Sequence, residues 1–370
     1  MIDFKTESKQ SMEKAFSKFD FMGLKLRNRF IRSATMEVMA SPDDGAPTEA
    51  LKELYLRLAV GGVGLISTSA CLSDRSWVPD PRGQLSLHSD AALPAWEEMI
   101  EAVHREGALI SVQFGPFFYL NGRPVGPSAY RPGVHALSSG EIEQLVLAFG
   151  AAAKRARKVG ADAVQVHAGH GYPVSQFLSP LYNQREDEYG GSPSNRARLL
   201  VEIRRAMADS AGRDFPVWIK MNSFDGQPGG ITPEDADAYG PILFEAGYGA
   251  VEVTGGSPRG SHDSRGPLNK EEWFEGYYLK NAARMKKHTD LPVVAVGGIR
   301  RPEMVDRILS DEMADLIAMS RPFIREPGLI QRWMSGDLSP AACISCNGCF
   351  KVMRQGKGLY CVQEKGESNK

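Results

Sequence analysis

The amino-acid sequence predicts an α/β protein in which residues 1–335 form a (β/α)8 TIM barrel and residues 336–370 form a short cysteine-rich extension. Eight short apolar runs alternate with longer helical segments, as in a barrel of parallel strands. The runs are continuously apolar, which is typical of strands buried on both faces. An open doubly wound sheet is the main alternative, but its strand–GxGxxG–helix pattern is absent.

The predicted elements follow one another in regular order. A small hairpin is expected over residues 19–26. The barrel strands are expected at residues 30–34, 63–67, 109–114, 163–166, 216–221, 249–253, 292–296 and 314–319. The helices are expected at residues 48–60, 93–106, 138–158, 195–211, 232–246, 278–287, 301–309 and 327–334. Capping signals support three of them, namely Thr48 with Glu49, the capping box of Ser138 with Glu141, and Thr232 before Pro233.

Composition and charge exclude several classes of partner. The chain has 370 residues and a net charge of −1, which gives no reason to expect nucleic acid or an anionic membrane as a partner. The polar start lacks a signal peptide, and no apolar run approaches the ~20 residues of a membrane span. We expect a cytoplasmic protein that acts on a small molecule, and the sequence leaves a homo-oligomer open.

Polar and glycine residues gather where the predicted strands end. In a barrel the active site forms at the carboxyl ends of the strands, so we expect these side chains to share one site. They are Ala34 and Thr35 after the first strand, Gln113 in the third, His167, His170 and Tyr172 after the fourth, Lys220 in the fifth, Gly297 and Gly298 after the seventh, and Ser320 and Arg321 after the eighth.

Two of these strand ends are typical of a phosphate site. Gly297-Gly298 and Ser320-Arg321 each precede a predicted helix, and barrels commonly bind phosphate after strands seven and eight. Glycine lets backbone N–H groups approach a phosphate, helix N-termini favour negative charge, and Arg321 adds a cation that can bind bidentately. The alternative is a plain tight turn with a solvent-exposed Arg321.

Lys220 is unusual because lysine is rarely buried without a partner. An anionic ligand would explain it, such as the N1–C2 carbonyl region of a reduced flavin. A plain ion pair with Asp225 or Glu252 is the alternative.

His167, His170 and Tyr172 are predicted to lie on a loop of about 25 residues, a length that is usually functional in a compact domain. The glycines and the proline around them argue against a helix across the histidines. The histidines could clamp a substrate, bind a metal or form a hydrogen-bonded pair in the core. A zinc-dependent barrel hydrolase is the hypothesis from another class, although a third ligand is not evident, and HExxH, GxSxG and Walker A motifs are absent.

A long motif after the fourth strand resembles the signature of the old yellow enzyme family of FMN-dependent oxidoreductases. The matching residues are His167, His170-Gly171-Tyr172, Gln176-Phe177-Leu178-Ser179-Pro180, Asn183, Arg185, Asp187, Tyr189-Gly190-Gly191-Ser192 and Asn195-Arg196. Further matches are Asn28-Arg29-Phe30, Gly126-Pro127-Ser128-Ala129, Val296-Gly297-Gly298-Ile299 and Ser320-Arg321-Pro322-Phe323. The resemblance covers about residues 18–335.

The resemblance implies an FMN at the barrel mouth that NAD(P)H reduces. It implies hydride transfer from the reduced flavin to an alkene conjugated to a carbonyl or nitro group. The implied roles are flavin-ring contacts for Gln113, Lys220, Ala34 and Thr35, phosphate binding for Gly298 and Arg321 beside Gly297 and Ser320, hydrogen bonds to the substrate oxygen for His167 and His170, and proton donation for Tyr172.

Several residues depart from the family pattern. The run after Gln113 is Phe114-Gly115-Pro116-Phe117-Phe118 rather than a histidine followed by Gly-Arg. Met36 stands near a usual cysteine or threonine, Pro173 replaces a leucine and Ser320 a glycine. These differences leave substrate choice and redox potential open.

The last four of the five cysteines, Cys343, Cys346, Cys349 and Cys361, are clustered like metal ligands. Their segment resembles the iron–sulfur segment of dienoyl-CoA reductases and trimethylamine dehydrogenases. There a [4Fe–4S] cluster connects FMN to a further dinucleotide-binding domain, and we expect that domain to be missing here. A cluster would then exchange electrons with a separate electron-transfer protein or be structural, and zinc or free thiols are the alternatives. Cys71 is expected in the core.

Overall fold

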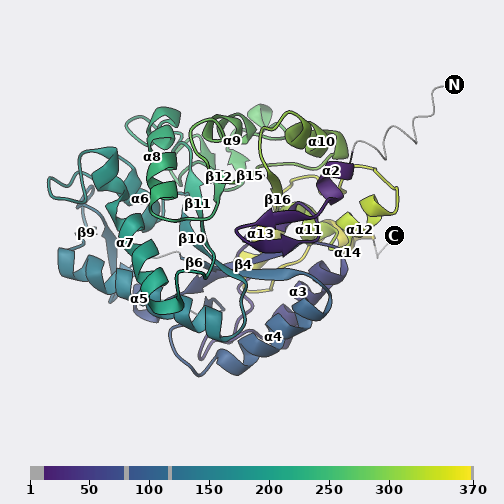
Figure 1. The fold of residues 1–370 in the computed structure, drawn as a ribbon, viewed down its shortest axis with the longest axis horizontal. Coiled ribbons are helices and arrows are strands. Elements are labelled where there is room, and N and C mark those ends of the chain that lie inside the picture. Colours follow the sequence, from purple (N-terminus) through teal and green to yellow (C-terminus); the bar gives the residue numbers. More distant parts are fainter. Residues whose placement is uncertain (1–11, 79–82, 116–118, 368–370) are drawn as a thin grey trace.

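The computed structural model describes residues 12–78, 83–115 and 119–367. Eight parallel strands close into a barrel through the pairing of the last with the first, which confirms the predicted fold (Figure 1). In order around the barrel they are β3 (Phe30–Arg32), β4 (Leu65–Leu72), β6 (Leu109–Phe114), β10 (Ala163–Ala168), β11 (Val217–Asn222), β12 (Val251–Thr254), β15 (Val293–Val296) and β16 (Leu316–Met319).

The expected helices lie outside this barrel. They are α3 (Glu49–Val60), α4 (Leu93–Arg105), α5 (Ser139–Lys158), α7 (Pro193–Ala211), α8 (Pro233–Glu245), α9 (Leu279–Met285), α10 (Pro302–Ser310) and α12 (Leu329–Met334). The predicted caps are present, because Thr48, Ser138 and Thr232 each accept a hydrogen bond from a backbone N–H in the first turn.

Shorter elements fill the connections and the two ends. Near the N-terminus are α2 (Glu13–Phe16) and the expected hairpin of β1 (Phe19–Phe21) and β2 (Leu24–Leu26). The hairpin packs Phe21 edge-on against Trp218, with ring centroids 5.3 Å apart. Beyond it are η1 (Arg75–Trp77), β5 (Leu85–Ser86), β7 (Tyr119–Leu120), β8 (Arg123–Gly126), β9 (His135–Ala136), β13 (His262–Asp263), β14 (Gly266–Pro267) and η2 (Lys270–Glu272).

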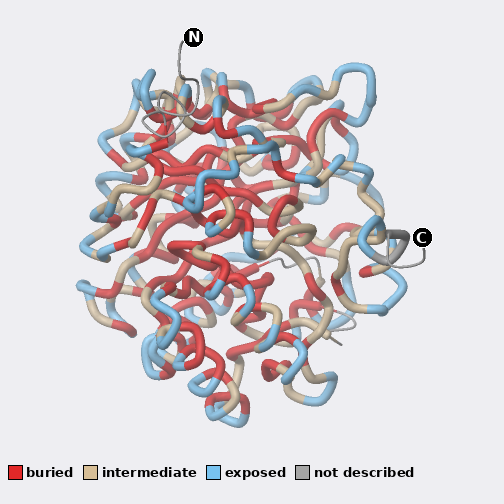
Figure 2. The backbone as a smooth tube through the Cα atoms, turned by 90° about the vertical axis from the view of Figure 1, so that its right-hand side faces the viewer, coloured by how far each residue is buried: buried red, intermediate tan, exposed pale blue. Residues whose placement is uncertain are grey.

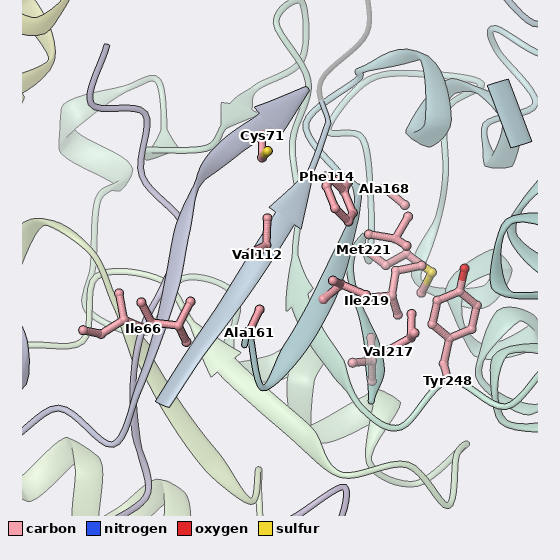
Figure 3. Packing of buried hydrophobic residues seen from close by; sticks show 14 of the residues in the cluster. Ile66, Cys71, Val112, Phe114, Ala161, Ala168, Val217, Ile219, Met221 and Tyr248 are labelled. Carbon is pink, nitrogen blue, oxygen red and sulfur yellow. The ribbon is translucent and has the colours of Figure 1, made fainter. Parts of the chain in front are cut away.

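The hydrophobic core lies mainly between the strands and the surrounding helices. Buried segments run through the middle of the molecule, and exposed ones form its outer turns (Figure 2). Side chains such as Val112, Phe114 and Ile219 pack in this layer (Figure 3). Cys71 is buried among them as a small core residue, as expected, and burial raises the pKa of its thiol well above the usual value.

The connection after the fourth strand differs from the prediction in two ways. β10 continues through Ala168, so His167 lies on the strand and not on the loop after it. The six-residue helix α6 (Pro173–Leu178) then interrupts the predicted loop. Pro173 begins this helix, where its fixed φ and missing N–H cause no loss, and the turn before it uses left-handed backbone at His170 (φ 60°). After the eighth strand, α11 (Arg321–Arg325) was not predicted either.

The C-terminal segment returns to the mouth of the barrel through α13 (Gly348–Arg354) and α14 (Val362–Glu367) (Figure 1). That residues 336–370 form a unit separate from the barrel stays a prediction. In the part of the chain that is described, no helix has the length and apolar character needed to cross a bilayer. Two predictions concern residues that the structure does not describe. They are the lack of a signal peptide, in residues 1–11, and the departure from the family pattern at residues 116–118.

Candidate active site

A cavity of about 470 Å3 opens at the carboxyl ends of the barrel strands. Every barrel residue that the sequence singled out lies in its wall. They are Ala34, Thr35, Gln113, His167, His170, Tyr172, Lys220, Gly297, Gly298, Ser320 and Arg321. Of the tail cysteines, Cys349 lines the cavity as well.

His167 and His170 form one wall of the cavity together with Tyr172. The ring centroid of His167 lies 5.0 Å from that of His170 and 5.2 Å from that of Tyr172. Thr254 Oγ1 lies 2.9 Å from Nε2 of His170, and the backbone N–H of His170 donates to Asn222. Nδ1 of His167 is buried and has no hydrogen-bond partner among the described residues. A bound molecule with a polar group would satisfy it.

Burial keeps the two imidazoles neutral and the phenol protonated. Desolvation, followed by the charge of Lys220, lowers the pKa of His167 to about 3. Desolvation also lowers the pKa of His170 well below its usual value, with smaller effects from His167 and Lys220. Desolvation raises the pKa of Tyr172, which Arg354 opposes. At neutral pH each imidazole therefore offers one N–H, and the phenol carries a proton.

Lys220 belongs to a buried polar layer across the barrel. Its Nζ lies 2.9 Å from Glu252 and donates to Ser33 Oγ at 2.9 Å, and Ser33 donates to the same carboxylate at 2.6 Å. Gln165 also donates to Glu252, and Gln113 donates to Gln165. The register explains these contacts, because neighbouring strands place Lys220 beside Glu252 and Gln165 beside Gln113.

Of the two carboxylates weighed as ion-pair partners of Lys220, the structure selects Glu252. Asp225 is engaged elsewhere, since it accepts hydrogen bonds from Ser179, Asn222 and the backbone of Ile231. The ion pair does not prevent a contact between Lys220 and a flavin, because Lys220 also lines the cavity.

The opposite end of the cavity contains Gly297, Gly298 and Arg321. Both glycines have positive φ (129° and 71°), which other residues rarely adopt. A Cβ on Gly298 would lie 2.9 Å from the ring of Tyr277. Arg321 donates to Asn347 of the tail at 2.7 Å and to the hydroxyl of Tyr277 at 3.1 Å. The hydroxyls of Thr35 and Ser320 lie 2.7 Å apart.

The helix N-terminus that follows Gly297-Gly298 is already capped by a carboxylate. At the start of α10, the backbone N–H groups of Arg300 and Arg301 already donate to Glu275, at 2.6 and 2.8 Å. These amides are therefore not free for a phosphate. The Arg300 side chain lines the cavity instead, and its Nε is buried without a partner among the described residues. Sequence reasoning missed Arg300, although it directly follows the Gly297-Gly298-Ile299 run.

The four tail cysteines are all described, but their arrangement does not by itself define a metal centre. In the described parts of the chain, no group of three or more His, Cys, Asp or Glu side chains is placed to hold a metal ion, either in the tail or at the histidine pair. Burial raises the thiol pKa of both Cys343 and Cys349. Gln363 Nε2 lies 3.8 Å from Sγ of Cys346. A metal bound by Cys343, Cys346, Cys349 and Cys361 stays a prediction.

Known proteins resemble this chain over most of its length. A model of the NADH:flavin oxidoreductase / NADH oxidase family matches residues 14–337. The chain is 33% identical over 362 residues to a metal reductase of Desulforamulus reducens, covering 94% of this chain and 53% of that protein. It is 32% identical over 332 residues to an NADPH dehydrogenase of Clostridium acetobutylicum, covering 85% and 92%. The chain thus spans about half the length of the first relative and nearly all of the second.

Among solved structures, an old yellow enzyme homologue from Zymomonas mobilis superimposes with a TM-score of 0.75. The two chains are 24% identical, and the match covers 90% of this chain and 96% of that one. This likeness supports the barrel fold.

Proposed function

The chain belongs to the NADH:flavin oxidoreductase / NADH oxidase family, the old yellow enzyme family, and on this basis we propose that it is an FMN-dependent NAD(P)H oxidoreductase. Its proposed substrates are alkenes activated by a conjugated carbonyl or nitro group. The convergence of all the predicted barrel residues on one cavity carries this proposal.

The residues of the cavity fit a flavin mononucleotide. The cavity volume of about 470 Å3 is in the range of cofactor sites. Arg300 Nε is a buried donor without a partner among the described residues, and Arg300 lines the cavity together with Arg321. An FMN phosphate would satisfy it. Gln113 and Lys220, at the centre of the barrel, would hold the polar edge of the ring, and Ala34 and Thr35 would line it.

Bound FMN would supply the hydride chemistry, and this chain's residues would bind and polarise the substrate. The neutral imidazoles of His167 and His170 would donate hydrogen bonds to the substrate oxygen, where negative charge develops during hydride addition. Such donors stabilise the transition state more than the ground state. Tyr172, protonated at neutral pH, would give its proton to the α-carbon of the alkene.

Replacement of Tyr172 by phenylalanine tests the proton donor. We expect alkene reduction to slow by roughly 10²-fold, because general acid catalysis contributes about that much or more. Reduction of the flavin by NAD(P)H should change little, since that step needs no proton from the phenol. Stopped-flow measurement of the two half-reactions separates these effects. Equal slowing of both would contradict the proposed role.

A visible spectrum of the purified protein tests the cofactor. We expect a yellow protein with flavin absorption that NADPH or NADH bleaches under anaerobic conditions, and that an enone such as cyclohexenone restores. A colourless protein that does not bind added FMN would refute the proposal. Titration with each nucleotide in turn would also show which one is preferred.

A second candidate is an iron–sulfur flavoprotein that passes electrons between FMN and a separate protein. It is favoured by Cys349, which places a thiol of the cysteine-rich segment in the wall of the same cavity. Iron, sulfide and zinc analysis of protein purified without oxygen tests it. About four irons per chain would support a cluster, and one zinc would indicate a structural zinc site. The absence of iron and zinc would refute both the cluster and the zinc site.

A further inference from the structure

Five cationic side chains line the cavity. Lys220, Arg265, Arg300, Arg321 and Arg354 all line it, and no aspartate or glutamate is among its described lining residues. Enclosed walls of one charge attract ligands of the opposite charge. An FMN phosphate would account for the charge only at the end formed by Arg300 and Arg321.

Other cations of the wall already have partners. Lys220 pairs with Glu252. Arg265 donates to the carboxylate of Asp263 at 2.9 Å. Arg354 differs, because its side chain makes no ion pair or hydrogen bond with any described residue. Its guanidinium carbon lies 5.2 Å from the centroid of the Phe350 ring.

The position of Arg354 is set by α13. Asn347, just before this helix, receives a hydrogen bond from Arg321, and Met353 is buried with 3% exposure. Phe350 also contacts Arg265, whose guanidinium carbon lies 5.6 Å from the centroid of the Phe350 ring. The helix is therefore fixed to the barrel mouth by contacts of the residues that precede Arg354.

Arg354 lines the same cavity as Tyr172. Its charge favours the ionised form of Tyr172, the proposed proton donor. Arg321 has the corresponding effect on Tyr277, to which it donates a hydrogen bond. Arg354 and Tyr172 therefore border one space, whereas Arg321 is held by Asn347 and Tyr277.

We propose that Arg354 binds an anionic group on the small molecule that enters beside His167, His170 and Tyr172. This inference rests on the proposed function and restricts the proposed ligands to molecules that carry an anionic group. The anion is a carboxylate on the activated alkene or a phosphate of the nicotinamide nucleotide, and a guanidinium binds either. The structure thereby assigns the tail a direct part in ligand recognition.

The test compares Arg354→Met with Lys351→Met in the full-length protein. Lys351 lies on the same helix and is exposed outside the cavity wall, so its replacement makes the same change in charge. Acetylacrylate and its methyl ester serve as a matched pair of activated alkenes with and without a carboxylate. Their saturated products, levulinate and methyl levulinate, allow binding to the oxidised protein to be measured by calorimetry without turnover.

We expect Arg354→Met to weaken levulinate binding and raise the KM for acetylacrylate about tenfold, as for the loss of one partly exposed charged contact. The affinity for methyl levulinate and the KM for methyl acetylacrylate should change less than twofold. Lys351→Met should behave as wild type, and Arg354→Lys should retain most of the affinity for levulinate. If the KM for NADPH or NADH rises instead, the anion is the nucleotide phosphate.

Two results would overturn the inference: no change for any anionic ligand, or equal losses for acid and ester. Failure of the proposed function looks different. In that case wild-type protein would not be reduced by NAD(P)H, or would reduce neither alkene, while levulinate binding would still report on Arg354.

Discussion

Replacing His167 and His170 together by alanine is expected to lower kcat/KM for enone reduction by roughly 10³-fold or more, since one lost oxyanion donor alone costs 10²–10³. Both imidazoles lie in the wall of the cavity, and the buried Nδ1 of His167 has no partner among the described residues. Phenols that bind through their oxygen should lose affinity for the same reason. Stopped-flow reoxidation by cyclohexenone and titration with a phenol measure the two effects.

Retention of FMN separates this role from a structural one. The proposed flavin contacts lie on other strands, so the double variant should keep its flavin through gel filtration. His170→Asn provides the matched control, because an amide keeps one N–H donor and should recover part of the rate. Loss of FMN from the double variant, or unchanged enone reduction, would contradict a substrate clamp.

The sequence predicted the barrel because its strands and helices are set by local patterns of apolar residues and caps. The end of β10 was missed for a simple reason. His167 interrupts the apolar run, but its side chain points into the cavity while the backbone continues pairing with β11, where Lys220 is its neighbour. Pro173 was taken only as a helix breaker, yet it begins α6.

Contacts between distant segments were harder to predict. Arg354 and Phe350 lie in a short helix whose sequence gives no signal of what it packs against. The capping of Arg300 and Arg301 by Glu275 likewise depends on how the loop before α9 returns to the strand end. Such positions follow from tertiary packing, so residue type alone could suggest an anion site but not which donors remain available.

Replacing Glu252 by leucine is expected to lower the free energy of unfolding by about 3–5 kcal/mol, as in other proteins that lose one partner of a buried ion pair. Glu252 is fully buried and Lys220 is 5% exposed, so the ammonium would be left in a buried layer without its counter-charge. Gln165 and Ser33 would lose an acceptor as well. Denaturant titration followed by tryptophan fluorescence gives the change.

The pair of substitutions Glu252→Leu and Lys220→Met isolates the charge. Removing both partners should recover much of the stability lost in Glu252→Leu, because no uncompensated ammonium remains. Asp225→Asn is the matched control, since this equally buried carboxylate is bound by neutral donors and strands no cation when neutralised. A double variant less stable than Glu252→Leu would show that packing, and not the buried charge, dominates at this site. If the charge dominates, the barrel tolerates Lys220 beneath the proposed flavin because Glu252 compensates it.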